Sequence, residues 1–228
     1  MAVASEHSAD PRMLAHPFAL LLSAPSQSGK SHWILKLIRH CREKVNPPID
    51  KIIYVNATSS SQLKDKLMIE VTVARAGGSL PHLILTCEID TVRGDPHLNT
   101  LVVIDDLMND KNTEKTVEDL FIKRVHHENI SVAYLVQNLF HASKLHRTIS
   151  LNANYLWLGA NRRARDQIRT LAHQVYPGKT EFLLEAYHDA TTRKPYGYLW
   201  LDFKVATPEK YRVKTDVLEH APICYVPK

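Results

Sequence analysis

Short apolar runs alternate along the chain with longer stretches in which apolar positions recur every three to four residues. Runs of the first kind, bounded by turn-forming residues, predict buried strands, and the periodic stretches predict amphipathic helices. The predicted strands are 18–23, 51–56, 83–86, 101–104, 130–136, 154–158 and 196–203. The predicted helices are 30–43, 59–69, 114–127, 161–176 and 182–190. This alternation predicts an α/β fold with a mostly parallel sheet flanked by helices.

The first predicted strand runs into a loop of small residues that is typical of phosphate binding. Residues 24–31, here named the phosphate loop, read APSQSGKS and lead into a predicted helix. Such a loop aims backbone N–H groups and a helix N-terminus at one point, which suits a polyphosphate. We expect Lys30 to reach the β- and γ-phosphates of ATP, and the Ser31 hydroxyl to bind Mg²⁺. The predicted nucleotide-binding residues are Ala24, Pro25, Ser26, Gln27, Ser28, Gly29, Lys30, Ser31 and His32.

The phosphate loop departs at one position from the usual pattern G-x-x-x-x-G-K-[ST], because Ala24 stands where the first glycine is expected. Alanine fits at that position if its φ stays negative. The apolar strand before the loop and the helical spacing of the apolar residues after it support the motif. The sequence therefore predicts a P-loop NTPase.

A second apolar strand delivers two carboxylates, Asp105 and Asp106, at its C-terminal end. Ligands of parallel α/β sheets bind at this end of the strands. We expect Asp105 to hold Mg²⁺, as a Walker B aspartate does, and Asp106 to polarise the attacking water. Gln137 ends the next strand along the chain, where a polar side chain can sense the γ-phosphate or orient that water. A simple turn after the strand is the alternative for Gln137.

Arginines that follow these strands are candidates for two roles. An arginine finger from one subunit can reach the γ-phosphate bound by its neighbour, and Arg147, expected in a loop, is the first candidate, with Arg163 the second. Arg162, Arg163 and Arg165 are also candidate DNA contacts, through salt-sensitive neutralisation of phosphates. A solvated basic helix face is the alternative for this cluster.

Net charge, apolar runs and cysteine spacing place only broad bounds on the function of the protein. The 228 residues carry a net charge of +5, a mild bias toward polyanions. No apolar run approaches the length that spans a bilayer, so a soluble protein without a membrane partner is expected. The three cysteines lie far apart, which indicates a reducing compartment. The expected organisation is a flexible arm (1–17), one ATPase domain (18–212) and a C-terminal tail (213–228), a docking segment or a disordered end.

Residues 103–178 resemble the genome-packaging ATPases of Polinton- and adintovirus-type elements, which are relatives of the poxvirus packaging ATPase in the FtsK–HerA superfamily. The resemblance extends over about 18–202 and leaves the N-terminal arm and the final tail uncovered. The runs that carry it are IDDLM at 104–108, NISV at 129–132, QNLFH at 137–141, RTISLNA at 147–153 and AHQVYPG at 172–178.

The resemblance implies a RecA-like, ATP-driven motor that forms a homo-oligomeric ring and threads double-stranded viral DNA into a preformed capsid, at a capsid or portal vertex. It implies a place in the virion or at an assembly site in the host nucleus or cytoplasm. By position, the family's roles fall on Lys30, Ser31, Asp105, Asp106 and Gln137. Two alternatives stay open: a nucleotide-binding DNA-binding subunit without turnover, and a nucleoside or nucleotide kinase.

Overall fold

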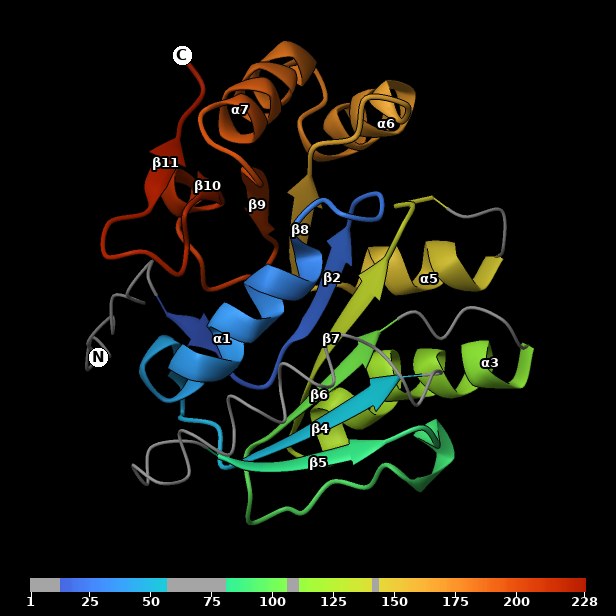
Figure 1. Ribbon diagram of the computed structural model, residues 1–228. Helices are drawn as coiled ribbons and strands as arrows, with labels where there is room; N and C mark the ends of the chain where they lie inside the picture. The colour runs from blue at the N-terminus through green and yellow to red at the C-terminus, as the bar shows by residue number, and fades with distance from the viewer. Residues whose placement is uncertain (1–12, 57–80, 106–110, 141–143) are drawn as a thin grey trace, which may run out of the picture.

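The computed structural model describes residues 13–56, 81–105, 111–140 and 144–228. Within these ranges, nine strands form one mixed sheet in the order β11-β10-β9-β8-β2-β7-β6-β4-β5 (Figure 1). Six neighbouring strands run parallel: β2 (Ala19–Ser23), β4 (Lys51–Asn56), β5 (His82–Thr86), β6 (Thr100–Asp105), β7 (Ile130–Val136) and β8 (Tyr155–Gly159). Three antiparallel strands extend the β8 side: β9 (Tyr198–Asp202), β10 (Val213–Thr215) and β11 (Ile223–Tyr225). Two-residue strands β1 (Leu14–Ala15) and β3 (Val45–Asn46) pair separately.

Helices cover both faces of the sheet, so its central strands are buried on both sides. One face packs against α1 (Lys30–Lys44), and the apolar residues of α1 and of this face form one core cluster. A second cluster joins the other face to helical segments that lie behind the sheet or above it in Figure 1. These are α3 (Lys111–Asp119), η2 (Leu120–Arg124), α4 (Val125–His127), α5 (Lys144–Asn152), α6 (Arg165–Val175) and α7 (Thr180–Thr192). Short 3₁₀ turns are η1 (Ile89–Thr91) and η3 (Glu209–Tyr211).

The parallel strands bring the ends of β2, β6 and β7 to one edge of the sheet. Strand β7 lies between the other two, with Ser23 of β2 opposite Val136, and Asp105 of β6 opposite Leu135. The amide of Ala24 continues the ladder by donating to the carbonyl of Val136 over 3.2 Å. The phosphate loop, the end of β6 and the residue after β7 therefore share one edge.

An aromatic cluster fixes α1 against the sheet. Trp33, in the first turn of α1, lies 5.6 Å from Trp200, 6.0 Å from Tyr198 and 6.4 Å from Trp157, measured between ring centroids. These partners come from β8 and β9, beside the strand that precedes α1. Burial of large rings on both sides of this contact stabilises the position of the helix and hence of its N-terminus.

The predicted α/β class is confirmed, with a mostly parallel sheet flanked by helices and a strand–loop–helix unit from β2 to α1. The predicted helix 114–127 is broken by a π-helical segment, η2, and the predicted helix 161–176 begins only at Arg165. Residues 213–228, expected as a tail, supply β10 and β11 to the sheet because the apolar Val213 is buried when β10 pairs with β9. The predicted helix 59–69 lies outside the described residues.

Candidate nucleotide-binding site

The phosphate loop presents a helix N-terminus that no side chain caps. Helix α1 begins at Lys30 after Gly29, with no side-chain cap hydrogen bond and no acidic residue in its first turn among the described residues. Two loop residues take a left-handed backbone, Gln27 with φ 62° and Gly29 with φ 90°. Turns of this kind and a helix start direct amide N–H groups to one side, where they can bind an anion.

Gly29 is required at its position for two reasons. A positive φ of 90° is accessible to glycine without strain. A Cβ built there would also come within 2.8 Å of the Cβ of Tyr196 and 3.1 Å of its ring atom Cγ. The loop thus reaches its conformation only with a residue that has no side chain.

Ala24 fits into the loop because the neighbouring strand leaves room for its methyl group. The residue is 1% exposed and does not take a positive φ. Its Cβ packs against Gly159 at the end of β8, where any added Cβ would approach it to 2.8 Å. The departure from the usual loop pattern is therefore matched by a glycine on the adjacent strand.

The ammonium group of Lys30 lies along the loop that precedes it. Its Nζ donates hydrogen bonds to the carbonyl of Ala24 and, over 2.9 Å, to the carbonyl of Pro25. The side chain is half-buried. A cation is thereby held beside the amide groups of the loop, where both attract the same kind of ligand.

Asp105 is oriented by a residue of the neighbouring strand. Tyr54 of β4 donates a hydrogen bond of 2.6 Å from its hydroxyl to Oδ2 of Asp105. Burial, and then the negative charge of Asp105, raises the pKa of Tyr54 well above its ordinary value, so the phenol stays a donor at neutral pH. The carboxylate is therefore aimed by a rigid, protonated partner.

A cavity of about 560 Å³ unites the loop with the two following strand ends. Residues 26–32 line it, together with Asp105, Gln137, the end of β7 and Tyr196. The structure thus brings together Lys30, Ser31, Asp105 and Gln137, which the sequence analysis predicted separately. Ala24 and Pro25 lie behind the lining, at the base of the loop. Asp106 lies outside the described residues.

The donor set of the cavity fits the groups that the sequence analysis expects. Ser31 offers a hydroxyl and Asp105 a carboxylate, and hard oxygen ligands of this kind suit Mg²⁺. The uncapped N-terminus of α1 and the ammonium of Lys30 suit the phosphates of ATP.

The expectation that Arg147 lies in a loop is wrong, because Arg147 lies in helix α5. Leu145 and Ile149 stand one helical turn apart in the sequence, and Ile149 is 1% exposed, so an apolar helix face was present in the pattern. Arg147 is exposed and is not among the residues that line the cavity.

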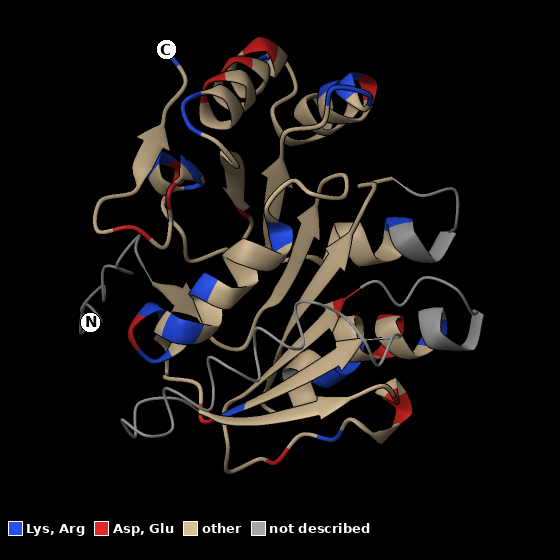
Figure 2. Cartoon of the chain, viewed as in Figure 1, with Lys and Arg blue, Asp and Glu red and all other residues tan. Residues whose placement is uncertain are grey.

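The three clustered arginines follow β8, the neighbour of β2, and so belong to the same edge of the sheet. Arg162 and Arg163 lie in a turn in which the amide of Arg163 donates to Oδ1 of Asn161 over 3.1 Å. This turn delays the start of α6 to Arg165. All three side chains are exposed, and Figure 2 shows basic residues on α6 at this edge. They do not line the cavity.

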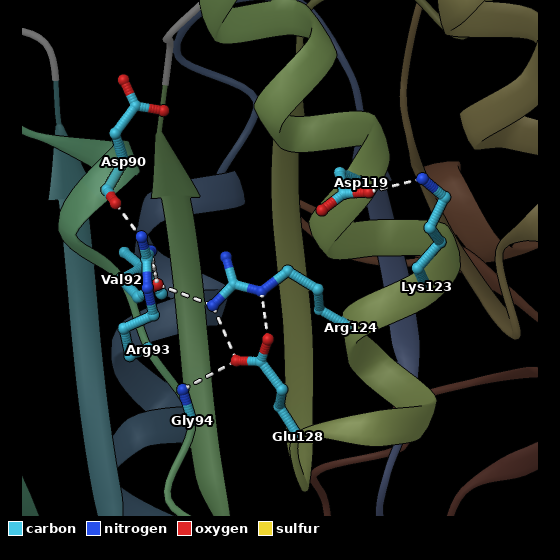
Figure 3. A network of polar contacts seen from close by, with 8 residues as sticks. All are labelled: Asp90, Val92, Arg93, Gly94, Asp119, Lys123, Arg124 and Glu128. Atoms are coloured by element: carbon cyan, nitrogen blue, oxygen red, sulfur yellow. Dashed lines mark hydrogen bonds and ion pairs between the residues drawn. The ribbon is translucent and has the colours of Figure 1, made fainter.

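A second cavity, of about 700 Å³, lies beside α3 and η2 and contains none of the predicted site residues. Figure 3 shows that charged side chains of this cavity form ion pairs with one another or bind backbone carbonyls. Arg124 and Glu128 form an ion pair of 2.6 Å, and Lys123 and Asp119 one of 2.9 Å. Arg124 also donates to the carbonyl of Val92, and Glu128 accepts from the amide of Gly94, so this pair ties η2 to the loop after η1 and has a structural role.

Two residues of the site were missed by the sequence analysis, Tyr54 and Tyr196. Tyr54 reads in the sequence as one apolar position of a buried strand, and its partner lies on another strand. Tyr196 lies between Pro195 and Gly197, which predict a turn. Nothing in this pattern indicates that the turn lies next to the phosphate loop.

No family model and no curated protein matches the sequence. Among solved structures, the chain is similar to the genome-packaging NTPase B204 from Sulfolobus turreted icosahedral virus 2 in complex with ATP-gammaS, with 13% identity, a TM-score of 0.47 and coverage of 90% of this chain and 97% of that one. For B204, the DNA-packaging ATPase from Sulfolobus turreted icosahedral virus, the identity is 14%, the TM-score 0.49 and the coverage 93% and 99%.

The KaiC-like protein PH0186 from Pyrococcus horikoshii OT3 is 9% identical, with a TM-score of 0.47 and coverage of 92% of this chain and 90% of that chain. In the part of the chain that the structure describes, no helix is both long and apolar enough to cross a bilayer. The function proposed below rests on the residues of the site itself.

Proposed function

We propose that this chain binds ATP with Mg²⁺ and hydrolyses it. The observation that carries the proposal is the shared cavity in which an uncapped helix N-terminus, Lys30, Ser31 and Asp105 face one space. A cation and amide groups on one wall and a carboxylate on another are the parts that phosphoryl transfer requires.

Each residue has a role in this proposal. The loop amides and Lys30 bind the phosphates and neutralise the charge that develops during transfer. Ser31 and Asp105 hold Mg²⁺, which supplies Lewis-acid stabilisation of that charge when bound. Gln137 orients the attacking water, and Asp106 polarises it.

We further propose that hydrolysis drives DNA translocation in a ring of identical subunits, as in viral genome packaging into a capsid. Among the described residues that line the cavity there is no arginine. A site without an arginine of its own favours an arginine finger donated by the neighbouring subunit, and Arg147 or Arg163 is the proposed donor. The exposed Arg162, Arg163 and Arg165, at the same edge, favour contact with the DNA backbone.

The test compares ATP hydrolysis by the wild type with Lys30→Ala and Asp105→Asn, each with and without duplex DNA. We expect both variants to lose at least a hundredfold in rate, because each loses a charge that stabilises the transition state. Lys210→Ala, which removes an exposed lysine outside the cavity, serves as the matched control and should retain the wild-type rate. Stimulation by DNA should fall as salt is added.

Each alternative predicts a different result in the same assay. Equal background rates for wild type and variants in every oligomeric state would leave a binding subunit without turnover. Transfer of phosphate to a nucleoside instead of water would indicate a kinase. A wild-type rate unchanged by DNA in an assembled ring would overturn the translocase proposal but leave the ATPase.

A further inference from the structure

Tyr196 occupies a backbone position that normally belongs to glycine. Residues 194–197 form a turn closed by the amide of Gly197, which donates to the carbonyl of Lys194 over 3.1 Å. Pro195 stands second in this turn, and Tyr196 stands third with φ 59°. A turn with proline second and a positive φ third favours glycine at the third position.

The glycine of this turn is Gly197, one residue after the position that favours glycine. It is required there because the backbone of α7 passes close to it. A Cβ on Gly197 would come within 2.3 Å of the carbonyl oxygen of Ala190 in α7. The glycine of the turn therefore stands at position 197, and Tyr196 keeps a positive φ that is strained for a residue with a side chain. Strained backbone of this kind persists where the surrounding structure holds it and is concentrated at functional sites.

The ring of Tyr196 faces the nucleotide cavity. Tyr196 lines that cavity and is 65% exposed, so burial of its ring does not offset the strain. Among the described residues its ring makes no aromatic pair. Its Cβ and ring atoms lie against Gly29, at the start of α1. An exposed flat ring thus stands directly beside the loop proposed to bind phosphates.

Ion pairs hold the turn in place relative to α1. Lys194 lies 2.5 Å from Asp216 and 3.7 Å from Glu219, measured from Nζ to a carboxylate oxygen. Glu219 in turn pairs with Lys36 of α1 over 2.5 Å. The turn is therefore linked through Glu219 to α1, the helix that begins at the phosphate loop.

We infer that Tyr196 is the platform on which the base of a bound nucleotide stacks. The inference rests on the proposed function of the site, because the loop must hold the phosphates for the base to lie beside this ring. Aromatic stacking accepts every base, since each has a flat π-face, so Tyr196 favours nucleoside triphosphates over bare triphosphate without selecting the base.

The test measures binding of Mg·ATP and of inorganic triphosphate with Mg²⁺ by calorimetry, for wild type, Tyr196→Gly and Tyr196→Phe. We expect Tyr196→Gly to bind ATP about tenfold more weakly and inorganic triphosphate as the wild type does. Tyr196→Phe keeps the ring and should keep the affinity for ATP. Because glycine suits the positive φ, the melting temperature of Tyr196→Gly should equal or exceed that of the wild type. Tyr211→Ala, a tyrosine outside the cavity, is the control.

Other outcomes decide against the inference. Equal weakening of ATP and inorganic triphosphate by Tyr196→Gly would mean that the ring only supports the phosphate loop. Unchanged binding of ATP and of inorganic triphosphate by Tyr196→Gly would mean that Tyr196 has no role in nucleotide affinity. If the wild type binds neither ligand, the proposed function itself fails and this inference fails with it. Weakening confined to ATP is the result that separates stacking from all of these.

Discussion

The hydroxyl of Tyr54 and the carboxylate of Asp105 form a contact between two strands that bears directly on the chemistry of the site. Tyr54 is 1% exposed and lies in the core beneath α1, so its ring has little freedom to move. Partners that orient a metal-binding carboxylate commonly affect metal affinity and rate by ten- to a hundredfold. Under the proposed function, Tyr54 is a positioning residue that acts through Asp105.

Tyr54→Phe removes this hydrogen bond and leaves the ring in place. We expect ATP hydrolysis to fall about tenfold and the Mg²⁺ concentration for half-maximal rate to rise, because Asp105 loses its fixed orientation. A titration of rate against Mg²⁺ measures both effects. Tyr155→Phe is the control, since its buried hydroxyl accepts a hydrogen bond from the amide of Ala15, outside the cavity. Equal losses in the two variants would mean that Tyr54 contributes only to stability.

At the scale of single residues, sequence indicates chemistry that stands next to a recognisable pattern. Asp105 and Gln137 lie at the ends of apolar strands, and Lys30 and Ser31 follow the short loop after another strand, so the prediction of parallel strands was enough to place all four at one end of the sheet. Tyr54 resembles any other apolar strand residue, because its role arises from pairing with a distant strand. Roles that arise from pairing in space leave no local mark in the sequence.

The π-helical segment η2 is an element that one ion pair ties to the rest of the fold. Arg124 binds Glu128 through two nitrogens and donates to the carbonyl of Val92 over 2.6 Å, while Glu128 accepts from the amide of Gly94 over 3.0 Å (Figure 3). Hydrogen bonds from Arg124, chiefly, lower the pKa of Glu128 to about 2. The pair thereby joins the helices behind the sheet to the loop before β6.

Glu128→Gln should lower the free energy of unfolding by about 1 kcal/mol at pH 7, because the ionised carboxylate is the form that Arg124 binds. A carboxyl with a lowered pKa stabilises the fold above its ordinary value of 4.5 and loses this effect as the pH falls toward 2. The difference between wild type and variant in urea unfolding should therefore shrink from pH 7 to pH 3. Glu118→Gln, in the same cavity, should show no comparable change.

At the scale of elements, the spacing of apolar residues predicted the strands more reliably than it predicted the helices and their internal geometry. Strands such as β4 and β7 are nearly continuous apolar runs, and their bounds agree with the sequence prediction. The π-helical turn within 114–127 preserves the same apolar face, so the sequence pattern did not reveal it. Helix α5 was missed because it is short, with nine residues, so its apolar positions span only about two helical turns.

The molecule as a whole has two edges with different roles. The C-terminal ends of the parallel strands carry the cavity, and the opposite edge carries a buried polar network around His16. The ring Nε2 lies 2.9 Å from Oδ1 of Asn129, and Nδ1 lies 2.6 Å from the hydroxyl of Ser131. Because an amide oxygen only accepts, Nε2 carries the proton and Nδ1 accepts from Ser131 in the neutral ring.

Acidification should destabilise the whole molecule through His16. Burial, chiefly, lowers the pKa of His16 below its ordinary value of 6.5, so the unfolded chain takes up a proton more readily than the folded one. The stability that the neutral ring supplies is complete above pH 6.5 and is lost as the pH falls below it. His16→Gln should therefore show a flatter loss of unfolding free energy between pH 7.5 and 5.5. His173→Gln, exposed on α6, should follow the wild type.

The arginines at the edge that carries the cavity give a further expectation for the assembled protein. Combined replacement of Arg162, Arg163 and Arg165 by alanine should abolish stimulation of ATP hydrolysis by DNA. The basal rate should stay unchanged if Arg147 donates the arginine finger and should fall if Arg163 donates it. The dependence of log affinity on log salt should lessen by about 0.9 for each phosphate contact removed. Arg193→Ala, on the exposed end of α7, is the control. A wild-type salt dependence in the triple variant would mean that DNA binds elsewhere.

Topology at this scale was only partly accessible from the sequence. Alternating strands and helices predict a parallel sheet because parallel strands need crossover connections, which are usually helical. The strands from β2 to β8 are parallel as predicted, although β5 and β6 are joined through the short 3₁₀ turn η1. The short strands β10 and β11 carry polar residues such as Lys214 and follow an irregular segment, so they read as a tail. They join the sheet because β9 leaves an edge for them to pair with.

The contact between Ala24 and Gly159 has a mechanical consequence. Gly159 ends β8, and the turn that bears Arg162 and Arg163 follows directly, while the hydroxyl of Tyr187 donates to the carbonyl of Gly159 over 2.9 Å. The methyl group of Ala24 therefore packs the base of the phosphate loop against the end of β8, directly before that turn. Replacement of Ala24 by the usual glycine would leave a gap at this contact, because Gly159 has no side chain to fill it.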